Sequence, residues 1–127
     1  MQALVVLTTV GNEEQANTIA RELVARRHAA CVNIVGGVRS VYRWQGKICK
    51  DSEYLLMAKT SIAEYPAVEA AIRELHTYEL PEILAFRVDE GEARFLAWIA
   101  ASLDKEAAFS DDDVDEGVAI PLDDTNF

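Results

Sequence analysis

The fold is decided by residues 30–60, which read ACVNIVGGVRSVYRWQGKICKDSEYLLMAKT. Runs typical of β-strands lie at 30–35, 38–44 and 54–60. Gly36-Gly37 is expected to break the first run. Lys50-Asp51-Ser52 is expected to form the tip of a hairpin, with Gln45-Gly46 as the competing turn. The centre of the chain is therefore predicted to hold strands in direct succession, without a helix between them.

Similar patterns place further elements on both sides of this stretch. They are strands over 3–10 and 83–88 and helices that begin after Asn12, after Ser61 and after Gly91. Asn12 can cap the first helix, and Gln15 stands where a capping box needs it. Ser61 and Glu64 predict a second capping box.

The order strand–helix–strand–strand–helix–strand, followed by a third helix, predicts an α+β fold. It is the ferredoxin-like βαββαβ sandwich with an extra C-terminal helix. Its two connecting helices cover one face of an antiparallel sheet, so the other face must either contact water or pack against another part of the protein or another subunit. Leu55, Met57, Tyr42 and Trp44 leave few strand positions polar enough for water, and the two aromatic residues suit an interface. We therefore predict an oligomer.

The net charge of −10 is concentrated at one end of the chain. Residues 104–127 contain nine acidic residues and one lysine, so they carry −8 of it. We predict one domain over 3–103 and an acidic, flexible tail over 104–127. Because the chain has no basic stripe, we do not expect it to bind nucleic acid.

The sequence also bears on the cellular compartment. No apolar run approaches the ~18 residues that a membrane-spanning helix needs. The first residues lack the basic region of a secretory signal. Cys31 and Cys49 are too few for a disulfide framework. We therefore expect a cytoplasmic protein with free thiols and no membrane association.

The densest group of reactive side chains lies where the second helix gives way to the last strand, in the stretch HTYELPEI. Its candidate residues are His76, Tyr78, Glu79 and Glu82. Pro81 stiffens this loop, which can then hold ligands at fixed distances. His76 is a metal ligand, a general base or a residue that ends the helix, where its charged form suits the dipole.

Two further residues have open interpretations. Cys31 lies within a strand, where a free cysteine usually packs as a small apolar residue, although thiolates also bind soft metals. Lys59 ends an apolar strand and is expected to pair with Glu82 or Glu53. The chain has no glycine-rich nucleotide loop and no nucleophile motif, so we do not predict an enzyme.

Four blocks of the chain resemble the CutA family of divalent-cation tolerance proteins. These are residues 29–34, 40–48, 59–60 and 76–83, and the likeness covers residues 3–103. The resemblance implies a ferredoxin-like fold and a tight homotrimer with a cleft between subunits. The family usually has proline where this chain has Gly11, and we expect this departure to loosen the loop.

Two functions compete at this point. The first is a trimeric protein that binds copper or another divalent metal, since imidazole and thiolate suit copper and zinc. By the resemblance, its metal ligands would be His76, Cys31, Glu79 and Glu82. The second is a small-ligand sensor similar to PII signalling proteins, without enzymatic activity. The resemblance implies a ligand cleft lined by Asn33, Trp44, Lys59 and Tyr78.

Overall fold

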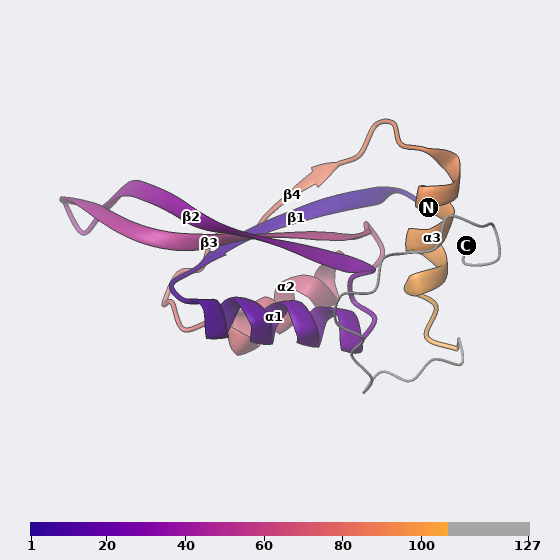
Figure 1. Ribbon diagram of the computed structural model, residues 1–127, viewed down its shortest axis with the longest axis horizontal. Coiled ribbons are helices and arrows are strands. Elements are labelled where there is room, and N and C mark those ends of the chain that lie inside the picture. Colours follow the sequence, from indigo (N-terminus) through magenta and orange to yellow (C-terminus); the bar gives the residue numbers. More distant parts are fainter. Residues whose placement is uncertain (107–127) are drawn as a thin grey trace.

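A computed structural model describes residues 1–106 as a sheet covered by two helices, with a third helix at one end (Figure 1). The elements are β1 (Ala3–Val10), α1 (Glu13–Ala25), β2 (Cys31–Trp44), β3 (Lys47–Ser61), α2 (Tyr65–Leu75), β4 (Leu84–Arg87) and α3 (Ala93–Ser102). The strands form one antiparallel sheet in the order β2-β3-β1-β4. The predicted α+β class and βαββαβ order are confirmed.

The core lies between the sheet and helices α1 and α2, which cover the same face (Figure 1). Its strand residues alternate along each strand, as one face of a sheet requires. They are Val6, Val10, Leu56 and Ala58. Its helix residues recur every three or four positions: Ala16, Ile19, Leu23, Val68, Ala71 and Ile72.

The opposite face of the sheet stays apolar and accessible in this chain. Val5 pairs with Phe86 and Leu7 with Leu84, so these residues share that face. Phe86 is 54% exposed and Leu84 is 51% exposed. Val35 of β2 adds a further exposed aliphatic side chain on the same side. Contiguous apolar surface of this kind usually marks an interaction site.

The tip of the hairpin lies at Gln45-Gly46, so the predicted tip at Lys50-Asp51-Ser52 is wrong. Gln45 and Gly46 have φ angles of 50° and 78°. Two central residues with positive φ make a type I′ turn, whose twist matches that of the flanking strands. Residues 50–52 therefore lie within β3, and Asp51 stands opposite Ser40.

Gly36-Gly37 does not break β2, contrary to the prediction. The strand continues through both residues, with a register shift against β3 between Val35 and Val38. Gly37 has a φ of 74°, which glycine adopts without a steric cost. The extra length is absorbed as a β-bulge, which bends the strand instead of ending it.

The helix starts agree with the sequence in part. Asn12 caps α1, since its Oδ1 accepts from the Gln15 amide at 2.8 Å. The Gln15 side chain donates to the carbonyl of Leu75 at 2.7 Å, which links α1 to the end of α2. The second predicted capping box is present in part: Ser61 Oγ accepts from the Glu64 amide at 3.3 Å. Ser61 is nevertheless the last residue of β3, and the N-cap of α2 is Glu64.

Residues after α3 attach it to the helical layer. Lys105 donates to the carbonyl of Arg27 and to the Glu64 carboxylate. Arg27 donates to the carbonyl of Asp104 at 3.0 Å. The rest of the predicted acidic tail, 107–127, lies outside the described residues. Within residues 1–106, no helix is long and apolar enough to cross a membrane.

Candidate functional site

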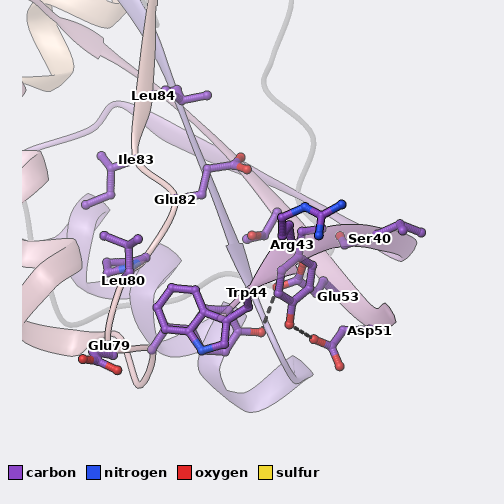
Figure 2. A pocket seen from close by; sticks show the side chains of 15 residues that line it. Ser40, Arg43, Trp44, Asp51, Glu53, Glu79, Leu80, Glu82, Ile83 and Leu84 are labelled. Atoms are coloured by element: carbon purple, nitrogen blue, oxygen red, sulfur yellow. Dashed lines mark hydrogen bonds between the residues drawn. The ribbon is translucent and has the colours of Figure 1, made fainter. Parts of the chain in front are cut away.

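A groove of about 880 Å³ lies between the β2–β3 hairpin and the connection from α2 to β4 (Figure 2). From the hairpin it takes Ser40, Val41, Tyr42, Arg43, Trp44, Asp51 and Glu53. The connection contributes residues 78–84, and β1 contributes Thr9. Four predicted site residues thus line one groove: Trp44, Tyr78, Glu79 and Glu82.

The lining of this groove has an excess of negative charge. Its carboxylates are those of Asp51, Glu53, Glu79 and Glu82, against the single guanidinium of Arg43. Carboxylates gathered on a concave surface raise the local concentration of cations. The groove therefore favours cationic ligands over anionic ones.

Tyr42 and Asp51 form a hydrogen bond across the hairpin, in which the phenol donates to Asp51 Oδ2 (Figure 2). Tyr42 stands opposite Cys49, so Asp51 is its diagonal neighbour on the same face. The hydrogen bond holds the phenolic proton and raises the pKa of Tyr42 to about 12. The pair fixes the Tyr42 ring beside β3 while both groups remain accessible.

Tyr78 connects the loop after α2 to the hairpin. Its hydroxyl donates to Glu53 Oε2 at 2.8 Å. Glu53 is only 6% exposed, and a buried carboxylate needs such a donor. Burial of the ring, together with the hydrogen bond to Glu53, raises the pKa of Tyr78 above that of an ordinary tyrosine.

Gly11 provides the space that the Tyr78 hydroxyl occupies. A Cβ atom at this position would lie 3.2 Å from Tyr78 Oη, closer than almost all such contacts. Gly11 is therefore in close contact with Tyr78 of the loop after α2.

His76 ends α2 and uses both ring nitrogens in hydrogen bonds to the backbone. Nδ1 accepts from the Tyr78 amide at 3.0 Å, so Nε2 carries the proton and donates to the Thr9 carbonyl at 2.7 Å. The imidazole also packs against the Tyr78 ring, with centroids 4.6 Å apart. The observed position is that of a C-cap residue, and a metal ion would have to replace one of these hydrogen bonds.

Three other predicted residues lie at the far end of the hairpin. Cys31 pairs with Lys59, and Asn33 pairs with Met57. Cys31 and Ser40 are separated by about 30 Å of strand, at ~3.3 Å per residue. Burial raises the pKa of the Cys31 thiol, and the positive charge of Lys59 opposes this only in part.

The expected ion pair of Lys59 is not found. Glu53 bonds to Tyr78, and six positions along one strand, about 20 Å, separate it from Lys59. Among residues 1–106, neither Glu53 nor Glu82 forms an ion pair with Lys59. The sheet instead places this ammonium beside Cys31 and Val5.

The proposed metal ligands do not converge in one chain. The part of the chain that the structure describes has no group of three or more His, Cys, Asp or Glu residues that could hold a metal ion. Glu79 and Glu82 share the groove, His76 is engaged with the backbone, and Cys31 lies far along β2. Their role as ligands stays a prediction, and it requires residues from more than one copy.

Sequence reasoning missed two groove carboxylates, Asp51 and Glu53, as well as the role of Tyr42. With the turn placed at 50–52, Asp51 would have stood at the hairpin tip. The signal was present in Gln45-Gly46, because a turn at these residues puts Tyr42 and Asp51 on one face of the hairpin. Glu53 could be found only through its partner Tyr78, which is distant in sequence.

Comparison with known proteins agrees with this architecture. Residues 4–102 match the family described as CutA1 divalent ion tolerance protein. The divalent-cation tolerance protein CutA of Thermus thermophilus is 48% identical over 95 residues, which are 75% of this chain and 92% of that protein. Protein CutA of mouse is 43% identical over 91 residues, covering 72% of this chain, and the matched part is 51% of the mouse protein.

The fold is also shared with solved structures. The periplasmic divalent cation tolerance protein CutA of Archaeoglobus fulgidus is 30% identical, with a TM-score of 0.78 over 80% of this chain and 99% of that one. The residues that match the family extend from β1 to α3. This chain belongs to the CutA1 family of divalent ion tolerance proteins.

Proposed function

We propose that this protein acts in tolerance of divalent cations as a homotrimer that binds copper or another divalent metal between its subunits. It would work by binding and not by catalysis. The names of its relatives support the tolerance function. The exposed apolar face of the sheet supports self-association, since Phe86, Leu84 and Val35 need a cover.

One observation carries the intersubunit site: the predicted residues form two groups at opposite ends of the hairpin. Tyr78, Glu79 and Glu82 line the groove. Cys31 lies about 30 Å along β2 from Ser40 of the groove, and Lys59 lies about 20 Å along β3 from Glu53, at ~3.3 Å per residue. We propose that a neighbouring copy brings the second group of residues to the first.

The charge of the groove supports a metal over the alternative of an anionic small ligand. Four carboxylates against one guanidinium attract divalent cations and repel phosphates or carboxylates. A thiol supplied by Cys31 of a neighbour would shift preference toward copper and zinc, because soft ligands select those ions. Copper also binds most tightly in the usual order of divalent metals.

The compartment remains a proposal of the same kind. We propose a cytoplasmic location, supported by the free thiols of Cys31 and Cys49. The archaeal relative is named as a periplasmic protein. Cell fractionation with antibody detection decides between the two locations.

The function is tested by calorimetric titration of copper into the intact oligomer, with its mass measured by light scattering on the same sample. We expect a mass of three chains and a fixed ratio of metal to trimer. Loss of a ligand in Cys31→Ser or Glu79→Gln/Glu82→Gln should weaken binding by about tenfold or more. The double variant Glu13→Gln/Glu14→Gln, which removes equal charge on α1, is the matched control.

The two double variants distinguish metal binding at the groove from a general attraction of metal ions to negative charge. Weak binding that changes equally in the groove variant and in the α1 control would contradict a metal site in the groove. A monomer at micromolar concentration would contradict the intersubunit cleft itself.

A further inference from the structure

The hairpin has two chemically different faces. Residues that stand opposite one another in an antiparallel pair share a face, and the register therefore sorts them. One face carries Tyr42, Trp44, Asp51 and Glu53 and forms much of the groove. The other face, called the basic face here, carries Arg39, Val41, Arg43, Ile48, Lys50 and Ser52. Of these, Val41 and Arg43 also contribute to the groove lining.

The basic face has three cations and no carboxylate. All six of its side chains are exposed, Val41 by 65% and Ile48 by 68%. Within residues 1–106, the side chains of Arg39, Arg43 and Lys50 form no hydrogen bond or ion pair. Charged groups interleaved with exposed aliphatic ones suit a partner that is acidic and partly apolar.

Residues 107–127 of the same chain have this chemistry. They contain seven carboxylates and no basic residue. Val114 lies within the first acidic run, and Val118, Ile120 and Leu122 lie between this run and Asp123-Asp124. We propose that the segment 107–127 docks on the basic face of the hairpin, in its own copy or in a neighbouring one.

The length of the segment is sufficient for this contact. Lys105 is held at the end of α1 through the Arg27 carbonyl, close to where β2 starts. Arg39 lies about 26 Å along β2 from Cys31, at ~3.3 Å per residue. A segment from residue 106 to Glu116 spans at most about 35 Å. The first acidic run therefore reaches the basic face of its own copy only when extended, and it reaches a neighbour's face if the copies adjoin.

Zero-length carbodiimide cross-linking of the full chain tests this docking. The reagent joins lysines to carboxylates in direct contact, and Lys50 is the only lysine of the basic face. Lys47 is exposed on the opposite face and serves as an internal control. We expect Lys50 to couple to carboxylates of 107–127 several-fold more than Lys47 does, and high salt should suppress that coupling. Mixing light and heavy isotope-labelled protein separates contact within a copy from contact between copies.

A charge-reversal variant makes the test specific. Arg39→Glu/Arg43→Glu keeps Lys50 and should reduce its coupling to 107–127 several-fold, while Lys47→Glu leaves it unchanged. Circular dichroism of both variants reports whether the fold is intact. Equal coupling of Lys47 and Lys50, or coupling of Lys50 that survives the charge reversal, overturns the proposal. Cross-links from Lys50 to carboxylates within residues 1–106 also overturn it, because another folded surface would then cover the basic face.

Discussion

Replacement of Tyr78 by phenylalanine measures how strongly the groove loop is held to the hairpin. The change removes the hydroxyl that donates to Glu53 Oε2 at 2.8 Å and leaves a carboxylate that is 6% exposed without this donor. A hydrogen bond to a charged group contributes about 1.5–3 kcal/mol, and losing one partner exposes the other to its desolvation penalty. We therefore expect Tyr78→Phe to lower the free energy of unfolding by about 2 kcal/mol.

The chain offers a close control for this measurement. Tyr42 donates to Asp51 in the same groove, but both of these side chains are exposed. Water can replace the lost donor there, so Tyr42→Phe should lower the free energy of unfolding much less than Tyr78→Phe does. Both variants keep the aromatic ring, so packing is nearly unchanged.

Urea unfolding at one fixed protein concentration, with the oligomeric mass checked by light scattering, gives both values. A double-mutant cycle with Glu53→Gln then isolates the interaction between Tyr78 and Glu53. The reasoning is refuted if the two tyrosine variants lose the same stability, or if the cycle shows no coupling between Tyr78 and Glu53.

Three further predictions follow from the same part of the fold. Gly11→Ala should lower the free energy of unfolding by about 1 kcal/mol, because its Cβ presses on the Tyr78 hydroxyl, and the loss should shrink when urea unfolding is repeated in a Tyr78→Phe background. Gly46→Ala should cost about 1 kcal/mol in the same assay, since its φ of 78° is unfavourable for alanine. The pKa of Tyr42 is raised from 10.0 to about 12 by its hydrogen bond to Asp51. The stabilising effect of this hydrogen bond is therefore complete below pH 10 and is lost as the pH rises toward 12. Absorbance at 295 nm should show this late titration, and Tyr42→Phe should remove part of it.

Much of the fold could be predicted from local patterns. The alternation in β1 and β3 and the helical period of α1 and α2 identify the elements, because each must bury one face against the other layer. The hairpin turn could not be predicted with the same success. Lys50-Asp51-Ser52 has the composition of a turn, but the geometry selects Gln45-Gly46, where both residues accept positive φ.

The position of the candidate site in the chain could be predicted, but the hydrogen-bond partners of its side chains could not. The stretch from Tyr78 to Glu82 does line a groove, as its reactive residues indicated. The function of His76 depends on hydrogen bonds to Thr9 and Tyr78, and residue types alone do not reveal such partners. The hydrogen bond of Glu53 could not be predicted either, because its donor, Tyr78, lies 25 residues away in the sequence.

The position of the turn has a consequence for the whole hairpin. A turn at Gln45-Gly46 makes β2 and β3 14 and 15 residues long, so that alternation sorts many side chains onto two faces. Acidic and aromatic residues then gather beside the loop after α2, while Arg39 and Lys50 lie on the opposite side. A one-residue slip in register would exchange these faces and would place the carboxylates away from the loop. The chemistry of the groove and that of the basic face therefore depend on one turn, and any variant that shifts this register should alter both together.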